Sequence, residues 1–259
     1  MIKAAFFDID GTLLSFKTHR VSEGTIRAFD RLHAAGVRTF ISSGRPMVLI
    51  PPMPVSFEGY ITMNGGLVQL LTPNSSLLTL RSNPIPEADK QAWLDFAAAH
   101  HIATMLFSAD GMMGAQVNDI ALKLRDELEF EMPPIVTIDE MRRHEAFQLI
   151  AVMPPSLDAE VCSLMPRCRL PRWTHIFTDI VAAGNSKAEG MEAICNHYGI
   201  RQDETLAFGD GGNDIEMLQW AGTGVAMGNA APEVQQSADM VTASVDDEGI
   251  EKAIERLGF

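Results

Sequence analysis

Hydrophobic and polar positions along the N-terminal part of the chain predict a strand, a helix and a second strand. The apolar run at residues 4–7 has the length of a buried strand. Apolar residues then recur at helical spacing over residues 26–32, and Gly36 is a typical residue at the end of such a helix. A further apolar run at residues 37–41 predicts the second strand.

The C-terminal part repeats this alternation. A helix over residues 187–198 ends at Gly199, and the apolar run at 205–208 precedes the polar segment GDGGND. The apolar positions that follow predict a helix through Ile215 and Leu218 and short strands at residues 225–226 and 240–242. Strands that alternate with helices favour right-handed crossovers and a parallel sheet. We therefore expect an α/β fold, a Rossmann-like doubly wound parallel sheet with helices on both faces.

The middle of the chain has a different pattern and predicts an inserted α+β cap domain at residues 83–181. Pro84 and Pro86 precede a helical segment. Strand-like runs follow at residues 104–107, 147–152 and 175–180. Glutamates alternate at Glu127, Glu129 and Glu131, which predicts a solvated strand edge. The flanking segments, 1–82 plus 182–259, form one core domain only when they are joined.

Composition and charge narrow the class of protein. The 259 residues are 46% hydrophobic and 21% charged, as in an ordinary globular protein. The formal net charge of −14 argues against nucleic acid and anionic membranes as partners, because both require clustered cations. The N-terminus lacks the features of a secretory signal, and no run reaches the ~18 apolar residues of a membrane span.

The chain contains three cysteines, which is an odd number, and they lack CxxC spacing. We expect them to be buried, reduced thiols in a cytoplasmic protein.

Three polar segments each follow a predicted strand: DIDGT at 8–12, SSGRP at 42–46 and FGDGGND at 208–214. In a doubly wound sheet, binding sites form beyond the carboxyl ends of the strands. The three segments are therefore expected to face one crevice. Lys187, at the start of a helix just after the insertion, can reach into the same crevice.

Asp8 and Asp10 leave the first strand two residues apart, and these carboxylates suit phosphoryl chemistry. One can attack phosphorus to form an aspartyl phosphate while the other handles protons. Attack on an anion requires cations, and Lys187 supplies one. Asp8, the Asp10 carbonyl and Asp210 offer the oxygen ligands that suit Mg²⁺. The Ser43 hydroxyl and nearby backbone N–H groups, such as that of Gly44, can hold phosphoryl oxygens.

A DxDG segment by itself is also common in turns. The other segments, in this order and each after a predicted strand, favour the chemical interpretation.

With these segments in order, the chain resembles the haloacid dehalogenase superfamily, and within it the Cof-type sugar phosphatases of subfamily IIB, whose α/β cap is inserted between the second and third motifs. The matching segments are DIDGTLL, ISSGRP, the NGG at 64–66, NSKAEGM, FGDGGNDIEML, GVAMGNA, ADMVT and DDEGI. The resemblance spans essentially the whole chain. Many relatives have Thr where Ser43 stands, which keeps the hydroxyl.

The resemblance implies roles for the matched positions. Asp8 is implied as the nucleophile and Asp10 as the general acid and base. The implied phosphate-binding residues are Ser43 and Lys187, and the implied metal ligands are Asp8, Asp10 and Asp210. Asp214 is implied to support the metal or Lys187, and Asn213 to contact phosphate or a metal-bound water.

Four further residues are candidates for substrate contacts. Arg45 can steer the substrate or a cap loop, or it can form a structural ion pair. Asn64 follows a predicted strand, where an Asn-Gly turn explains it equally well. In the cap, we expect His175 and Asp179 to hydrogen-bond sugar hydroxyls.

The sequence thus predicts a Mg²⁺-dependent phosphatase of small phosphorylated metabolites, above all sugar phosphates. A phosphosugar mutase on a similar fold is the main alternative. A phospho-signalling receiver also uses Asp, Mg²⁺, Ser or Thr and Lys at strand ends, but it is about half as long and needs no cap. A monomer or a weak homodimer is expected.

Overall fold

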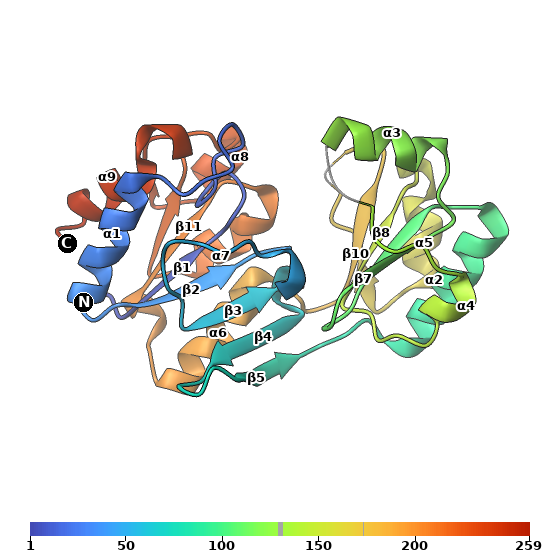
Figure 1. Cartoon of the computed structure of the whole chain (residues 1–259), viewed down its shortest axis with the longest axis horizontal. Helices are drawn as coiled ribbons and strands as arrows, with labels where there is room; N and C mark the ends of the chain where they lie inside the picture. The colour runs from blue at the N-terminus through green and yellow to red at the C-terminus, as the bar shows by residue number, and fades with distance from the viewer. Residues whose placement is uncertain (129–131, 173) are drawn as a thin grey trace. The chain divides into compact units, whose positions relative to one another are not determined.

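The computed structural model describes residues 1–128, 132–172 and 174–259, which divide into two compact units (Figure 1). The first unit comprises residues 1–45, 50–82 and 186–259, and the second comprises residues 46–49 and 83–185. The second unit thus interrupts the sequence of the first.

An eight-stranded sheet forms the centre of the first unit, in the order β13-β12-β11-β1-β2-β3-β4-β5. Neighbours from β13 to β3 pair in parallel, whereas β4 and β5 pair antiparallel at one edge. The bounds are β1 Ala4–Phe7, β2 Arg38–Ser42, β3 Gly59–Thr62, β4 Leu67–Leu71, β5 Leu77–Ser82, β11 Thr205–Gly209, β12 Thr223–Ala226 and β13 Met240–Val241. The expected doubly wound α/β core is confirmed.

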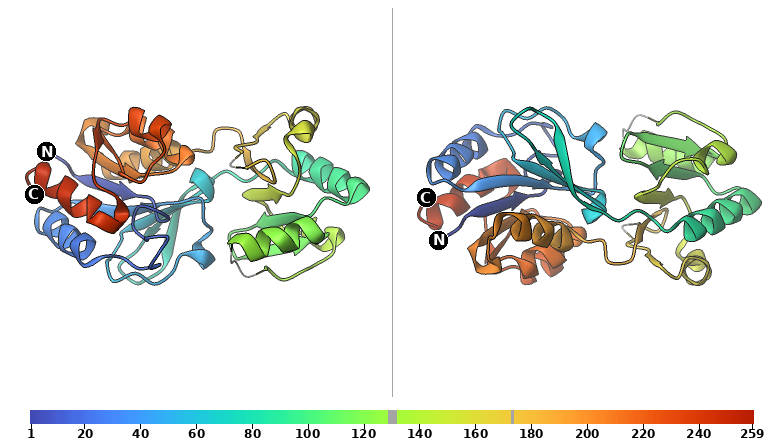
Figure 2. Two further views of the ribbon diagram at one scale, coloured as in Figure 1. Left: turned by 90° about the horizontal axis from the view of Figure 1, so that it is seen from above. Right: turned by 90° about the horizontal axis from the view of Figure 1, so that it is seen from below.

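Helices cover both faces of this sheet (Figure 2). Along β1, Phe7 faces a cluster that includes residues of α1 and α9, and Phe6 faces a second cluster that includes residues of α6 and α7. This alternation is the period of two that a strand imposes on its side chains. The helices are α1 Glu23–Ala34, α6 Lys187–Tyr198, α7 Ile215–Trp220, α8 Pro232–Gln236 and α9 Gly249–Arg256. Short 3₁₀ turns are η2 Met63–Gly65, η4 Gln202–Glu204, η5 Gly212–Asp214 and η6 Val245–Asp247.

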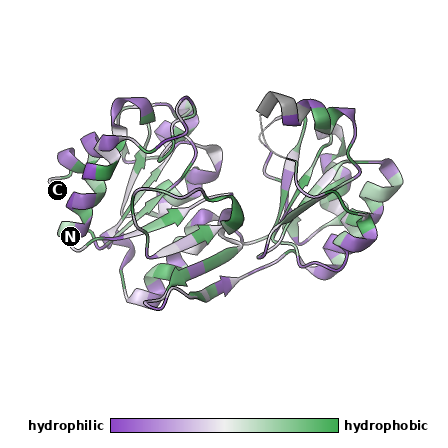
Figure 3. Cartoon of the chain, viewed as in Figure 1, coloured by the Kyte–Doolittle hydropathy of each residue, from purple (hydrophilic) through white to green (hydrophobic). Residues whose placement is uncertain are grey.

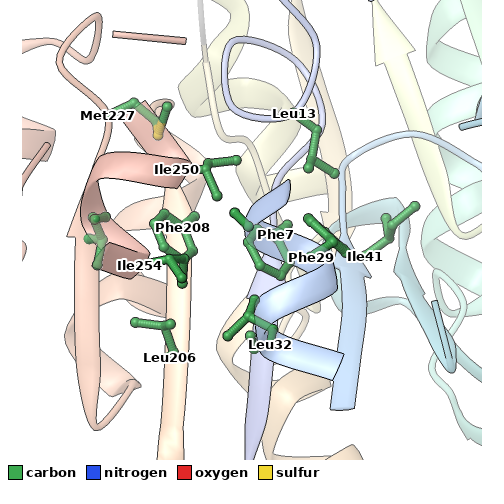
Figure 4. Close-up of a cluster of buried hydrophobic side chains, with 14 of the residues drawn as sticks. Phe7, Leu13, Phe29, Leu32, Ile41, Leu206, Phe208, Met227, Ile250 and Ile254 are labelled. Atoms are coloured by element: carbon green, nitrogen blue, oxygen red, sulfur yellow. The ribbon is translucent and has the colours of Figure 1, made fainter. Parts of the chain in front are cut away.

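Aromatic rings fill the centre of the cluster under α1 and α9 (Figure 4). The ring of Phe7 stacks on Phe208, with centroids 5.0 Å apart, and contacts Phe29 at 4.6 Å. Phe29 also meets Phe57 edge to face at 5.4 Å. These contacts join β1, β11 and α1, so the core holds together the strands from which the candidate site extends.

In the sheet, β1 lies between β2 and β11. The strand order reverses at this position, which is the switch point of the doubly wound sheet. Strands β2 and β3 follow on one side of β1, and β11, β12 and β13 follow on the other. The carboxyl ends of β1, β2 and β11 therefore lie next to one another.

The second unit is built on a five-stranded antiparallel sheet in the order β7-β6-β8-β10-β9. Its strands are β6 Thr104–Phe107, β7 Met112–Ala115, β8 Gln148–Ala151, β9 Cys168–Arg169 and β10 Thr178–Ala182. Its helices are α2 Glu87–His100, α3 Asp119–Leu128, α4 Ile138–Met141 and α5 Asp158–Leu164, with 3₁₀ turns η1 Met47–Leu49 and η3 Pro155–Leu157. Trp93 of α2 is fully buried, and its indole N–H donates to Thr104 Oγ1 at 3.0 Å. Hydrophobic residues concentrate inside each unit (Figure 3).

Several elements differ from the sequence-based expectation. The antiparallel strands β4 and β5 were not expected, because the alternation of strands and helices indicates only parallel neighbours. Strand β10 begins at Thr178, and His175 lies exposed in the preceding turn. The strand edge predicted at Glu127 is wrong, since α3 includes that residue, while Glu129 and Glu131 lie outside the described residues.

The described cysteines are all free thiols, but only Cys195 is buried as expected, Cys168 is partly buried and Cys162 is exposed. None of the helices that the structure describes is long and apolar enough to cross a membrane.

The aromatic cluster predicts a large loss of stability for Phe29→Ala. Phe29 is 1% exposed, and removal of a buried Phe ring costs about 3–5 kcal/mol of unfolding free energy. Urea unfolding followed by circular dichroism measures this loss. Leu77→Ala is the control, because Leu77 is 44% exposed on β5 and its truncation is expected to change stability by no more than about 0.5 kcal/mol. Equal effects of the two substitutions would contradict the packing of Phe29 in the aromatic cluster.

Candidate active site

Three polar segments meet at the carboxyl ends of adjacent parallel strands. Asp8 directly follows β1, Ser43 follows β2 and Asp210 follows β11. Because β1 pairs in parallel with both β2 and β11, these residues leave the sheet at the same edge. The Asp8 N–H donates to the Phe208 carbonyl at 3.0 Å, which extends the β1–β11 pairing up to the site.

Lys187, the first residue of α6, forms a buried ion cluster with two carboxylates. Its Nζ lies 2.6 Å from Asp8 Oδ1 and 2.5 Å from Asp214 Oδ1. The side chains of Lys187 and Asp214 are both 0% exposed. The second oxygen of Asp214 accepts the backbone N–H groups of Asp210 and Gly211 at 3.0 and 2.9 Å. Asp214 thereby holds both the lysine and the loop that carries Asp210.

Burial and charge oppose each other in this cluster. Burial raises the pKa of Asp8 well above its ordinary value, and the charge of Lys187 lowers it. Burial lowers the pKa of Lys187, but the charges of Asp214 and Asp8 outweigh this effect and hold it above the ordinary value. Lys187 is therefore a permanent cation, and it favours the ionised form of Asp8 that nucleophilic attack requires.

Asp210 completes a cluster of carboxylates that could hold a metal ion. Ligand oxygens of Asp8, Asp210 and Asp214 lie within 4.8 Å of one another. Asp210 accepts hydrogen bonds from Thr12 Oγ1 and Asn229 Nδ2, both at 3.1 Å. Burial, followed by the charge of Asp214, raises the pKa of Asp210 to about 6. No salt bridge to Asp210 occurs within the described part of the chain.

The carboxylate of Asp10 pairs with Arg45 and not with Lys187. Its carboxylate accepts two hydrogen bonds from Arg45, from Nε to Oδ2 and from Nη2 to Oδ1, both at 2.7 Å. The carboxylate of Asp10 is thus outside the three-carboxylate cluster. The four aspartates, with Lys187 and Arg45, leave a net charge of −2, which suits a divalent cation.

The hydroxyl of Ser43 is placed to donate a hydrogen bond to a ligand. The side chain is buried, and its Oγ accepts the Arg45 backbone N–H at 3.1 Å. Its own N–H donates to the Ile61 carbonyl at 2.8 Å. Among the described residues the hydroxyl accepts this bond and donates none, and the Gly44 N–H has no acceptor. Both groups can therefore donate to a ligand.

Asn64 and Asn213 meet at the same edge, where Asn213 Nδ2 donates to Asn64 Oδ1 at 2.9 Å. Asn64 has a left-handed backbone with φ of 52°, which Asn tolerates better than most residues. The next residue, Gly65, has φ of 86°, and a Cβ there would lie 2.0 Å from the Ser186 carbonyl oxygen. The turn thus packs against the start of α6 and orients Asn213.

Two residues that support Asp210 were not predicted from the sequence. Asn229 Nδ2 donates to Asp210 Oδ2 and, at 2.9 Å, to the Gly11 carbonyl, and Thr12 holds the other oxygen of Asp210. They lie in GVAMGNA and DIDGT, two segments that the sequence analysis singled out, but only the fold brings these segments together. A Cβ on Gly11 would lie 2.2 Å from Asp210 Oδ2, so a residue without a side chain is required there.

The two candidate cap residues belong to the second unit. Asp179 is buried on β10, and His175 is exposed in the turn before it. Their expected contacts with a sugar stay a prediction.

Comparisons with known proteins agree with this arrangement. Residues 5–254 match a family model described as haloacid dehalogenase-like hydrolase. The chain is 33% identical to "Putative phosphatase YkrA" of Bacillus subtilis, over 99% of this chain and 98% of that protein.

Solved structures are similar as well. The sugar phosphatase BT4131, of subclass IIB in the same superfamily, is 36% identical with a TM-score of 0.86 over 99% of both chains. BT1666 from Bacteroides thetaiotaomicron, described among the phosphatases of this superfamily, is 36% identical with a TM-score of 0.89 over 100% of this chain and 96% of that one.

The raised pKa of Asp210 predicts how the stability of the metal-free protein depends on pH. Between the ordinary value of 3.8 and about 6, the folded state binds a proton that the unfolded state has released, so stability falls as pH rises. Asp210→Asn removes this dependence. The stability of the variant relative to the wild type is therefore expected to increase from pH 4 to pH 7, by up to roughly 2 kcal/mol.

Urea unfolding in EDTA at several pH values tests this expectation. The readout is the change with pH, because the loss of one hydrogen-bond acceptor in Asn lowers stability at every pH. Asp203→Asn is the matched control, since Arg201 lowers the pKa of the Asp203 carboxyl and the difference should not rise with pH. A flat difference for Asp210→Asn would mean that the carboxyl is not raised.

Proposed function

Because this chain belongs to the haloacid dehalogenase-like hydrolases and is a phosphatase of that family, we propose that it hydrolyses small phosphorylated metabolites, above all sugar phosphates, with Mg²⁺ and through an aspartyl phosphate. The observation that carries the proposal is the Asp8 carboxylate, held by the fully buried Lys187 beside Asp210. In its ionised form, which the neighbouring ammonium of Lys187 favours, a carboxylate at the end of a strand is a competent nucleophile for phosphorus.

In the first step, Asp8 attacks the phosphorus and the bond between phosphorus and the leaving oxygen breaks. Lys187 holds Oδ1 of Asp8, which leaves Oδ2 for the attack. Asp10, in its acid form, gives its proton to the leaving oxygen. The products of this step are the free alcohol and the aspartyl phosphate on Asp8.

In the second step, water attacks the same phosphorus. The Asp10 carboxylate takes a proton from this water, and the bond between Asp8 and phosphorus breaks to release inorganic phosphate. Asp10 is thereby returned to its acid form and Asp8 to its carboxylate. One residue two positions after the nucleophile can serve both transfers, because both occur at one phosphorus.

The phosphate oxygens are bound by groups that follow the carboxyl end of β2 and by the first residue of α6. Lys187 supplies charge, while the Ser43 hydroxyl and the Gly44 N–H supply hydrogen bonds. Asn213, oriented by Asn64, supplies a further side-chain donor.

The residues at the site fit a Mg²⁺ ion. Asp8, Asp210 and the backbone carbonyl of Asp10 would hold it, all with the oxygen atoms that this ion prefers. The net charge of −2 among the charged groups of the site supports a dication. When bound, the ion neutralises phosphate charge and orients phosphate oxygens. Asp214 supports the site through Lys187 and the Asp210 loop.

The similarity to the sugar phosphatase BT4131, at 36% identity over 99% of both chains, supports sugar phosphates as the substrate class. We further propose that the second unit reads the sugar, with His175 and Asp179 as candidate contacts. A cytoplasmic location and a monomeric or weakly dimeric state stay predictions.

Two substitutions test the chemistry. Asp8→Asn is expected to abolish Mg²⁺-dependent release of phosphate, because an amide cannot form the intermediate. Asp10→Asn is expected to reduce it roughly 10²–10⁴-fold, the usual contribution of general acid–base catalysis. The measurement is phosphate release from a panel of phosphorylated metabolites and p-nitrophenyl phosphate, with Mg²⁺ or EDTA.

Asp30→Asn, on the exposed face of α1, is the control for these substitutions and should leave turnover unchanged. Near-normal turnover by Asp8→Asn would refute the assigned nucleophile. An isomerised sugar phosphate without free phosphate would indicate a mutase instead.

Metal binding can be tested without turnover. Mg²⁺ at about 100 times its dissociation constant is expected to stabilise the wild type by about 2.7 kcal/mol, since it binds only the folded state. Thermal unfolding at matched ionic strength measures the increase in Tm. Asp210→Asn should lose most of this increase and Asp30→Asn should keep it. The same increase in both variants would exclude Asp210 as a ligand.

A further inference from the structure

Arg45 holds both carboxylate oxygens of Asp10. Its Nε and Nη2 donate to the two different oxygens, each at 2.7 Å, in the paired geometry that a guanidinium and a carboxylate share. Two parallel hydrogen bonds fix the plane of the carboxylate as well as its position. A single charge at the same distance would fix neither.

Asp10 lies among other carboxylates, and Arg45 offsets its charge. Asp8 lies two residues before it, and the negative charge of Asp10 is felt at Asp210. Lys187 is engaged by Asp8 and Asp214, at 2.6 and 2.5 Å. Within the described ranges, Arg45 is the cation that pairs with Asp10.

The backbone of Arg45 is itself held by the scaffold. Its N–H donates to Ser43 Oγ at 3.1 Å, and its carbonyl accepts the Met63 N–H at 3.2 Å. Residue 45 is therefore tied to the end of β2 and to η2. Its side chain is 36% exposed, and that of Asp10 is 39% exposed, so both can meet a substrate.

We propose that Arg45 is a positioning residue for Asp10 in both proton transfers, an inference that rests on the proposed function. When Asp10 gives its proton to the leaving oxygen, it becomes the carboxylate that the two Arg45 N–H groups bind. The guanidinium stabilises the charge that develops during this transfer. It then holds the carboxylate in place to take a proton from the water that cleaves the aspartyl phosphate. Arg45 gains and loses no proton.

Leaving groups of different quality separate the two transfers. p-Nitrophenolate departs without a proton, so formation of the aspartyl phosphate from p-nitrophenyl phosphate does not need Asp10 as an acid. The alkoxide of a hexose phosphate needs that proton. Hydrolysis of the aspartyl phosphate needs Asp10 as a base whichever substrate formed it.

The experiment is a set of single turnovers with enzyme in excess and Mg²⁺ present, in which leaving-group release and phosphate release are timed separately. For Arg45→Met we expect p-nitrophenol release within about threefold of the wild-type rate. Phosphate release should slow roughly 10–100-fold, a part of the general acid–base contribution. With a hexose phosphate, both releases should slow. Arg45→Lys, which keeps the charge but not the two-pronged geometry, should recover only part of the rate.

Two further proteins complete the design. Arg38→Met is the matched control, because Arg38 begins β2, the strand that precedes Arg45, is also partly exposed and pairs with Glu58 instead. It should follow the wild type. Asp10→Asn should slow the same releases as Arg45→Met, by a larger factor: phosphate release with both substrates, and leaving-group release with the hexose phosphate only.

Other outcomes overturn the inference. A raised KM for both substrates with unchanged single-turnover rates at saturation would mean that Arg45 binds phosphate. Equal slowing of p-nitrophenol and phosphate release would mean that it only maintains the structure. Wild-type rates in Arg45→Met would make the ion pair incidental. If the wild type released phosphate from neither substrate, the proposed function would fail, and this inference with it.

Discussion

The buried contact of Lys187 with Asp8 and Asp214 is the interaction on which the rest of the site depends. Two of these side chains are fully buried and the third is nearly so. Breaking such a contact leaves an unpaired charge in the interior, which costs about 3–5 kcal/mol. Asp8 comes from the end of β1, Asp214 from η5 and Lys187 from α6. Asp8 precedes the second unit in the sequence, and Lys187 and Asp214 follow it. The cluster can therefore form only when these two parts of the chain have joined in one folded unit.

Charge balance explains the arrangement of the other polar groups. Lys187 pairs with both Asp8 and Asp214 but offsets only one of their two charges, and Arg45 pairs with Asp10. Asp210 is left with hydrogen bonds from Thr12 and Asn229, and burial raises its pKa to about 6. The overall charge of −14 argues against nucleic acid and anionic membranes as partners, but not against a small anionic substrate. Locally, the same acidity provides the charge that a metal ion would balance before an anionic substrate binds.

Close approach of the backbone allows these groups to meet. Gly11 leaves room for Asp210, and Gly65 leaves room for the start of α6. At both positions φ is positive and a side chain would overlap a neighbour, so small residues are required for two independent reasons. Both glycines lie in motifs that stand out in the sequence, but in each case the nearest atom that would meet a side chain belongs to a segment more than 100 residues away.

The sequence by itself determined the doubly wound core, because the spacing of apolar residues follows directly from helix and strand geometry. It also located the polar segments, since polar residues after a buried strand stand out locally. It did not predict β4 and β5, whose antiparallel pairing depends on which edge of the sheet is free. Only the tertiary structure decided that Arg45 pairs with Asp10 and that Asn229 supports Asp210. Such contacts depend on distances between remote side chains, and a linear pattern carries no information about those distances.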